Sequence, residues 1–364
     1  MRAVRVEQLR EGDVLARPIV LQAGTVLLRE GKKLTEQMIN RLNMLEIKNV
    51  YIESTQIPRT MEITKSFLRS PEPLTQQVRK NVYMRLIRLP DSQQAEGRVA
   101  ARAIEERFQR TFRTVMHDIA SSQTVLDHLV ALCQTDLYLF EHALNVALLS
   151  AILGLAQKYD YDQLVELTIG ALLFDIGMIR LPRELLMSNR SFTKEERKLM
   201  EKHTYEGYQF LRSSSDIPHN SALCALLHHE RYDGSGYPYQ LKQNDIHSYG
   251  QIVAIADMYA AMTTPRYYRR AYTPGEAAEF FYAAGNQAFE LSLIKLFFRH
   301  INVYPVSSVV RLSNGKTGFI STVDEDLAHR PTVKIVREAD GSTVGTPYEI
   351  DLKQNMDIVI VNVW

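Results

Sequence analysis

The sequence predicts a multidomain, mainly α-helical protein with a small N-terminal α/β module and a short C-terminal β element. Residues 98–302 contain one helical pattern after another. Residues 1–55 alternate short strand-like runs with one helical segment, and residues 303–364 contain strand-like runs joined by Asn-Gly and Asp-Gly turns. With 364 residues, the chain is long enough for two or three domains with cores of their own.

The N-terminal module is predicted to span residues 1–55. Its strand-like runs are VLARPIVL, GTVLL and NVYIE, and LTEQMINRLNMLEI has apolar residues at helical spacing. Residues 56–97 carry prolines at 58, 71, 73 and 90, so we interpret them as a linker with some helix.

A polar helix is predicted next, over EERFQRTFRTVMHDIASSQTVLDHLVALC. Acids are interspersed with its basic residues, which indicates a solvated face rather than a nucleic-acid stripe. We expect a homodimer to form through this helix. The final segment, residues 303–364, includes VVRLSNGKTGFI, PTVKIV and IVIVNV, and we expect it to fold as a small half-barrel.

Composition excludes several classes of function. A net charge of +1 gives no electrostatic case for binding a nucleic-acid polymer. Cys133 and Cys224 are the only cysteines and form no CxxC, so neither a disulfide framework nor a zinc-thiolate cluster is indicated. The first residues lack a signal-peptide pattern, and the longest aliphatic run, ALNVALLSAILGLA, is shorter than a membrane span. We therefore expect a soluble, cytoplasmic protein without a membrane span.

Asp175 is the only charged residue in the apolar run from Ile169 to Ile179. A buried carboxylate is costly without a partner, so a metal ion, a basic side chain or backbone donors should accompany it. The alternative is that Asp175 caps the end of a helix before Gly177. This stretch alone does not favour either interpretation.

Other polar residues lie singly in apolar helical patterns. A single buried histidine is usually a core residue with satisfied hydrogen bonds, but several such positions on successive helices can converge on one point. Imidazole together with carboxylate suits iron, manganese or zinc. These positions are His142, His203, His228, His229 and Asp257. The other histidines, which we interpret as surface or local structural residues, are His117, His128, His219, His247, His300 and His329.

Taken in order, these motifs resemble the HD-GYP domain, the branch of the HD phosphohydrolase superfamily that hydrolyses cyclic di-GMP. The resemblance covers roughly residues 98–310, and HHERYDGSGYP is its most specific part. The motifs are His142, FDIG at 174–177, His203, HHE at 228–230, DGSGYP at 233–238, and AD at 256–257 followed by RYYRR.

The resemblance implies a helical HD-type bundle and a metal-dependent site for bacterial cyclic-dinucleotide signalling. It implies that His203, His228 and His229 bind one metal together with Asp175, the bridging catalytic carboxylate. His142 and Asp257 would bind a second metal with the same Asp175. The residues implied to contact the substrate are Gly236, Tyr237 and Pro238 in the loop, and the pair Arg266 and Arg269, whose guanidinium groups suit phosphate oxygens.

Four positions depart from the family pattern. Phe174 replaces the histidine of the His-Asp signature, and Met178 replaces a lysine. Tyr138 replaces a glutamate that many members carry, and Ala260 replaces a second aspartate. One metal keeps four protein ligands, whereas the second keeps three. We therefore expect one tight metal site and possibly a second, weak one.

Two classes of function follow from this pattern, a phosphodiesterase and a binding module. We favour a metal-binding domain that recognises cyclic di-GMP or a related phosphodiester and hydrolyses it slowly or not at all. The alternatives are an active phosphodiesterase and a module that only contacts other signalling proteins. A nucleotide phosphatase of the wider superfamily is disfavoured because the GYP element is intact.

Overall fold

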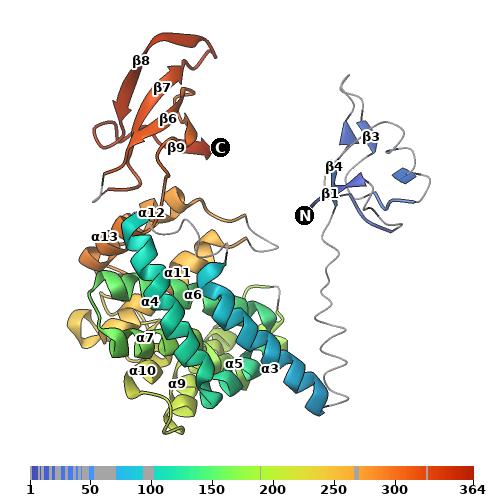
Figure 1. Cartoon of the computed structure of the whole chain (residues 1–364), viewed down its shortest axis with the longest axis vertical. Helices are drawn as coiled ribbons and strands as arrows, with labels where there is room; N and C mark the ends of the chain where they lie inside the picture. The colour runs from blue at the N-terminus through green and yellow to red at the C-terminus, as the bar shows by residue number, and fades with distance from the viewer. Residues whose placement is uncertain are drawn as a thin grey trace. The chain divides into compact units, whose positions relative to one another are not determined.

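A computed structural model of the chain consists of two compact units, residues 1–74 and residues 75–364. Within the second unit, it describes residues 75–92, 102–188, 190–265, 270–324 and 327–364. In the first unit it describes residues 2–6, 9, 12–15, 19–20, 26–28, 32–35, 38–39, 42, 49–52 and 71–74. Figure 1 shows small strands in the first unit, and helices followed by a sheet in the second.

The N-terminal unit contains short antiparallel strand pairs around a small apolar core. β1 (Arg2–Arg5) pairs with β4 (Asn49–Ile52), and β2 (Ile19–Val20) pairs with β3 (Val26–Leu28). Residues 38, 39 and 42 are helical. The core residues are Val6, Leu9, Leu15, Leu34, Leu42 and Val50. The predicted small α/β module is confirmed.

The second unit begins with the helical domain. Its long helices are α3 (Pro71–Arg88), α4 (Arg102–Ser121), α5 (Gln123–Thr135), α6 (Leu137–Ala156), α7 (Tyr161–Leu173), α9 (Lys194–Arg212), α10 (His219–Leu227), α11 (Ser248–Thr263), α12 (Pro274–Ala283) and α13 (Leu291–His300). Four short helical turns complete it: η2 (Leu89–Asp91), η3 (Ile176–Arg180), α8 (Arg183–Leu186) and η4 (Gln243–Asp245).

Helix α6 forms the centre of the helical domain, packed against α7, α11, α5 and α13. Most of its residues from Phe140 to Gly154 are apolar and buried, which is typical of a helix in the core of a domain. Among the described residues, α6 is the one helix long and apolar enough to cross a membrane, and 78% of its most apolar stretch is buried inside the fold. We therefore interpret α6 as a core helix.

One helix prediction needs correction. The polar helix predicted over residues 105–133 is two helices, because Ser122 leaves helical geometry and its hydroxyl accepts the Val125 N–H as the N-cap of α5. Helix α9 runs without a break from the charged segment after Thr193 through His203. A capping box between Thr193 and Glu196 begins α9, and its apolar face continues unbroken past His203.

The C-terminal element is a five-stranded antiparallel sheet in the order β8-β7-β6-β5-β9. The strands are β5 (Val309–Leu312), β6 (Thr317–Thr322), β7 (Thr332–Arg337), β8 (Thr343–Asp351) and β9 (Ile360–Val363). The predicted turns are present, with Gly315 at φ +85° in the Asn-Gly turn and Gly341 at φ +88° in the Asp-Gly turn. The predicted fold class, helical core and C-terminal β element included, is confirmed.

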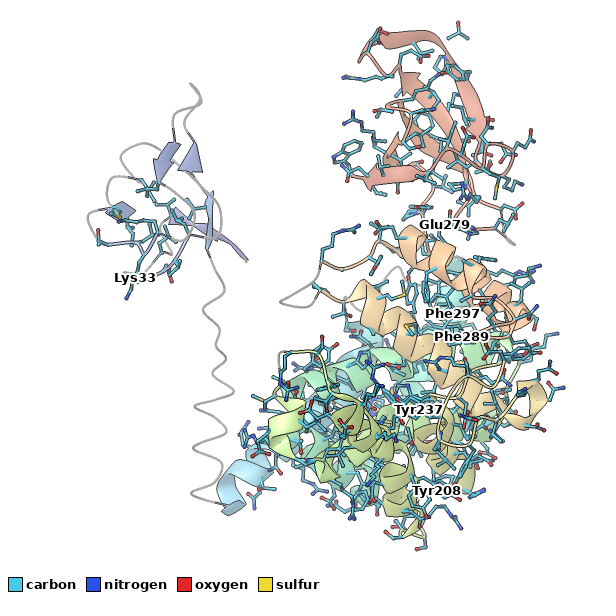
Figure 2. The ribbon with its side chains drawn as sticks, turned by 180° about the vertical axis from the view of Figure 1, so that it is seen from behind. Lys33, Tyr208, Tyr237, Glu279, Phe289 and Phe297 are labelled. Carbon is cyan, nitrogen blue, oxygen red and sulfur yellow. The ribbon has the colours of Figure 1, made fainter. Side chains whose placement is uncertain are left out.

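This sheet is joined to the helical domain through α12. The guanidinium of Arg330 lies 2.7 Å from the carboxylate of Glu279, and the ring of His329 stacks on Tyr282 with centroids 4.4 Å apart. Figure 2 labels Glu279 on the helix nearest the sheet.

Candidate metal centre

The candidate ligands are delivered by the ends and inner faces of five helical elements. Asp175 follows the last turn of α7 and precedes η3, while His203 lies within α9. His228 and His229 follow α10 directly. His142 lies on α6 and Asp257 on α11. The structure therefore brings residues that are more than one hundred positions apart to one side of the α6 core.

Glycines permit the close helix contacts that bring these elements together. A Cβ atom on Gly177 would lie 1.9 Å from the carbonyl oxygen of His203, so η3 packs directly on the α9 backbone. On α9, Gly207 lies opposite Gly177, and a Cβ atom on Gly207 would lie 3.0 Å from the Gly177 nitrogen. A Cβ on Gly170 would lie 2.4 Å from the sulfur of Cys224, so α7 and α10 approach equally closely. Asp175 is thereby held between His203 and His228.

Three histidines form a compact group of possible metal ligands. One ring nitrogen from each of His203, His228 and His229 lies within 4.8 Å of the others. The Nε2 atoms of His203 and His228 are 3.3 Å apart. Oδ1 of Asp175 lies 3.4 Å from the first of these nitrogens and 3.6 Å from the second.

The hydrogen bonds of the first two histidines fix which nitrogen faces this point. Nδ1 of His203 is 2.6 Å from the carbonyl oxygen of Met200, and Nδ1 of His228 is 3.0 Å from that of Cys224. A carbonyl oxygen only accepts, so in each ring Nδ1 carries the proton and the neutral ring presents an Nε2 lone pair. Two lone pairs and a carboxylate oxygen therefore face one another, and this donor set fits a divalent cation.

The sequence left open whether Asp175 caps a helix end, and the structure shows that it does not. Its side chain makes no capping hydrogen bond to η3, and its buried Oδ1 has no hydrogen-bond partner among the described residues. A buried carboxylate oxygen without a donor is costly unless a cation is present. This orphan atom, together with the facing imidazole nitrogens, fits a bound metal ion.

Burial sets the protonation of these groups. It lowers the pKa of His203 and, further, that of His229, which the neighbouring histidines lower as well. Burial opposes ionisation of Asp175, but the neighbouring rings of His228, His203 and His142 hold the pKa of this carboxyl below its ordinary value. Neutral imidazoles beside an ionised carboxylate are the forms that bind a divalent metal.

The second pair of predicted ligands has a different environment. Nε2 of His142 lies 2.7 Å from Oδ1 of Asp257, close enough for a direct hydrogen bond. The ring of Phe174 is fully buried and packs edge-on against both His142 and His228, with centroid distances of 6.0 and 4.9 Å. The ring of Tyr138 stacks on the ring of His142, with centroids 5.8 Å apart.

Of the remaining departures, Ala260 shares helix α11 with Asp257, and Met178 lies in η3, just after Asp175. Ala260 is buried one turn after Asp257 on α11, and Met178 is half-buried in η3. Neither side chain offers a charge to the pocket. The rings of Phe174 and Tyr138 lie beside His142, and Phe174 stands at the position of a histidine ligand in the resembled family.

The loop after the histidines lies against the metal centre. The Tyr237 ring stacks on His229 with centroids 4.6 Å apart and planes 24° apart, and Figure 2 labels Tyr237 inside the helical body. The Tyr237–Pro238 peptide bond is cis. Burial, followed by the charge of Asp175, raises the pKa of Tyr237 well above its ordinary value, so its hydroxyl keeps its proton. Arg266 and Arg269 lie outside the described residues.

One buried side chain near the site was not predicted. Glu230 is 2% exposed, and its carboxylate accepts hydrogen bonds from backbone N–H groups beyond the loop. The sequence placed this glutamate in the HHE motif but gave no signal of its partners, because they lie nine and eleven residues later.

Two parts of the sequence match known protein families. Residues 115–290 match the family described as HD domain, and residues 309–364 match the family described as KOW domain associated with HD domain. Over residues 115–290 the chain is similar to HD domains. The resemblance to HD-GYP proteins inferred from the motifs is confirmed, and the C-terminal sheet is the element that accompanies such HD domains.

Several curated relatives of this HD domain protein are named as cyclic-dinucleotide phosphodiesterases. Cyclic di-GMP phosphodiesterase PA4108 of Pseudomonas aeruginosa is 30% identical over 63% of this chain and 56% of its own length. Cyclic di-GMP phosphodiesterase PdeB of Borreliella burgdorferi is 26% identical over 54% of this chain and 51% of its own length. The chain thus spans about half the length of these relatives.

A shorter match has higher identity. A cyclic di-GMP phosphodiesterase of Thermotoga maritima is 45% identical over 29% of this chain and 28% of its own length. Among solved structures, an HDG"Y"P protein from Bdellovibrio bacteriovorus aligns over 81% of this chain and 97% of its own, with 17% identity and a TM-score of 0.41.

Proposed function

We propose that this HD domain binds one divalent transition metal tightly and recognises cyclic di-GMP or a related cyclic dinucleotide, with slow or absent hydrolysis. The observation that carries the proposal is the meeting of two imidazole Nε2 atoms with the unpartnered Oδ1 of Asp175, at 3.4 and 3.6 Å. The names of the curated relatives support the choice of ligand class.

The proposed metal ligands are Asp175, His203, His228 and His229. Three imidazoles and one carboxylate suit iron, manganese or zinc, and the donor set alone favours none of these over the others. A metal bound at this point would polarise a phosphoryl oxygen of the ligand. The hydrogen bonds from Nδ1 of His203 and His228 to helix carbonyls would keep the Nε2 atoms of both rings oriented toward the metal.

Recognition of the nucleotide is assigned to the loop and to the basic pair that follows α11. Tyr237, held against His229, would contact the ligand beside the metal, with Gly236 and Pro238 shaping the loop around it. Arg266 and Arg269 would bind the phosphates with their guanidinium groups. These assignments rest on the motif pattern and on the position of Tyr237.

Impaired turnover is inferred from the half-site at His142. Phe174 has no donor atom, and its ring packs between His142 and His228. The Asp257 carboxylate is within hydrogen-bond distance of His142. A second metal would have only His142, Asp257 and the shared Asp175 as ligands, so we propose that it binds weakly or not at all. Met178 leaves the developing phosphoryl charge without a cation at that position.

Binding and turnover, measured separately, test the proposal. Calorimetry with cyclic di-GMP, cyclic di-AMP and cyclic GMP-AMP should detect binding of at least one, and Tyr237→Ala should weaken it without unfolding the protein. Hydrolysis of the same panel, with manganese or iron supplied, should be slow or absent. Rapid turnover would favour the alternative of an active phosphodiesterase. Absence of binding to the whole panel would favour a module that contacts only proteins.

A further inference from the structure

Glu230 follows the two candidate ligands His228 and His229 directly, and in sequence it looks like a third ligand. Its carboxylate is already used in another way. Oε1 accepts the backbone N–H of Tyr239 at 2.7 Å, and Oε2 accepts that of Leu241 at 3.1 Å. These bonds satisfy a side chain that is 2% exposed, and ligating a metal would break them.

The backbone of Glu230 is fixed at the other end of the same loop. Its N–H donates to the carbonyl of Leu227, the last residue of α10, at 2.9 Å. One residue therefore joins the end of α10 to the far limb of the loop. The loop between these two attachments contains the whole DGSGYP segment.

The loop closes tightly over this residue. A Cβ on Gly236 would lie 2.4 Å from the His229 carbonyl oxygen and 2.5 Å from the Cα of Glu230, so only glycine fits. The next N–H, that of Tyr237, donates to the carbonyl of His229 at 3.2 Å. This places the Tyr237 ring on the His229 ring.

We propose that Glu230 is a positioning residue, which acts by holding the loop closed so that Tyr237 stays stacked on His229. It does not bind the metal. The effect on ligand binding rests on the cyclic-dinucleotide function proposed above, whereas the effect on loop order does not.

Loop order should control affinity. A ligand that needs Tyr237 in place has an apparent Kd equal to its intrinsic Kd divided by the fraction of molecules whose loop is closed. Hydrogen bonds to a charged acceptor are stronger than neutral ones, and an amide offers only one acceptor atom for the two N–H groups. Glu230→Gln should therefore reduce the closed fraction and raise the Kd for cyclic di-GMP roughly tenfold or more.

Hydrogen exchange measures the loop directly. In the full-length natural protein, the amides of Tyr237, Tyr239 and Leu241 should exchange slowly. In Glu230→Gln they should exchange at least about tenfold faster, while amides within α6 and α10 keep their rates. If Glu230→Gln does not fold, Glu230→Asp keeps the charge but shortens the side chain, and the same result is expected from it. Unchanged exchange at all three amides in a folded variant would overturn the proposal.

Metal content separates a positioning residue from a ligand. Glu230→Gln should retain the same number of metal equivalents as the natural protein after dialysis. Loss of the metal together with the nucleotide affinity would show that Glu230 is a ligand or a general structural support, and would overturn the proposal. Glu196→Gln is the matched control, because Glu196 also accepts a backbone N–H, that of Thr193 at 2.9 Å, but at the exposed start of α9. It should change neither exchange in the loop nor affinity.

A double-mutant cycle tests whether Glu230 acts through Tyr237. If it does, Glu230→Gln weakens cyclic di-GMP binding in the natural background but has little further effect in a Tyr237→Ala background. Additive losses would contradict the proposal. If the natural protein binds no cyclic dinucleotide, the function proposed above fails, and the exchange and metal measurements still decide the role of Glu230.

Discussion

Phe174 is the residue most at odds with the metal centres of the family that this chain resembles. Its ring has no donor atom and packs against both His142 and His228. We predict that Phe174→His raises metal content toward two equivalents, and that Phe174→His with Met178→Lys hydrolyses cyclic di-GMP measurably faster than the natural protein. Elemental analysis and a hydrolysis assay check this.

The same variant should be less stable, by about 1–3 kcal/mol in the free energy of unfolding, because an imidazole replaces a larger buried apolar ring. Met178→Lys alone is the control and should leave metal content unchanged. Natural protein that already turns over as fast as the double variant would contradict the inference of impaired catalysis.

The buried imidazoles give a second prediction, for pH. In the folded protein the pKa values of His203 and His229 are below their ordinary value of about 6.5, so the unfolded chain takes up protons first as pH falls. The lowered pKa of the Asp175 carboxyl acts in the same direction, but only below about pH 4, where carboxyl groups of the unfolded chain take up protons. Metal-free protein should therefore lose stability on acidification below about pH 6.5, by up to about 1.4 kcal/mol per pH unit for each histidine.

Urea unfolding of metal-free protein at several pH values between 5 and 7.5 measures this slope. His203→Gln should reduce it, because glutamine does not titrate in this range. A metal-free protein that becomes more stable on acidification would contradict burial as the cause of the lowered pKa values.

Single residues also show how far the sequence could predict the site. Asp175, His203, His228 and His229 were identified as lone polar residues in apolar helical patterns, and the structure brings them together. The role of Glu230 could not be identified, because its partners are backbone N–H groups of a folded loop, and a backbone N–H has no sequence signature. Arg266 and Arg269 stay predictions.

At the level of elements, the contact of η3 with α9 decides where Asp175 lies. A methyl group at Gly177 would overlap the His203 carbonyl and lie 2.7 Å from the Gly207 nitrogen. Gly177→Ala should therefore push η3 from α9, lower stability by about 1–3 kcal/mol or more, and weaken metal retention. Thermal unfolding and elemental analysis measure both effects.

Gly345→Ala in β8 is the matched control, since no described atom lies within 4 Å of a Cβ placed there. It should leave stability and metal content nearly unchanged. A Gly177→Ala variant as stable as this control, with full metal content, would show that η3 can move without disturbing the ligands.

Helices and strands were predicted well where the apolar periodicity is strong. They were predicted poorly where a single residue decides where a helix ends or how closely two helices pack. The helical core and the turns at Gly315 and Gly341 follow from apolar spacing and from turn chemistry. The break at Ser122 could not be separated from a continuous helix, because apolar spacing resumes in phase soon after it. The close approach of α7 and α10 at Gly170 depends on tertiary packing that periodicity does not report.

At the level of the whole molecule, the C-terminal sheet is fixed to the helical domain by Arg330. Its guanidinium contacts Glu279 on α12 and donates to the carbonyls of Met356 and Ile358 within the C-terminal element. Arg330 is buried, whereas Glu279 is 44% exposed. We predict that Arg330→Leu destabilises the protein by roughly 2 kcal/mol or more, and Glu279→Gln by less than about 1 kcal/mol.

Chemical unfolding of both variants checks this order. A larger effect from Glu279→Gln would mean that the ion pair, rather than the bonds within the sheet, makes the main contribution. The finer domain boundaries at residues 55, 97 and 302, the homodimer through the helix after the linker and the cytoplasmic location all stay predictions.

The most direct test of the whole account is the metal content of the full-length protein, purified without oxygen and dialysed. We predict about one tightly held equivalent of iron, manganese or zinc in the natural protein, and its loss in a His228→Ala, His229→Ala double variant. Two or more equivalents retained by the natural protein, or full metal retention in the double variant, would contradict the proposed single metal centre at Asp175, His203, His228 and His229.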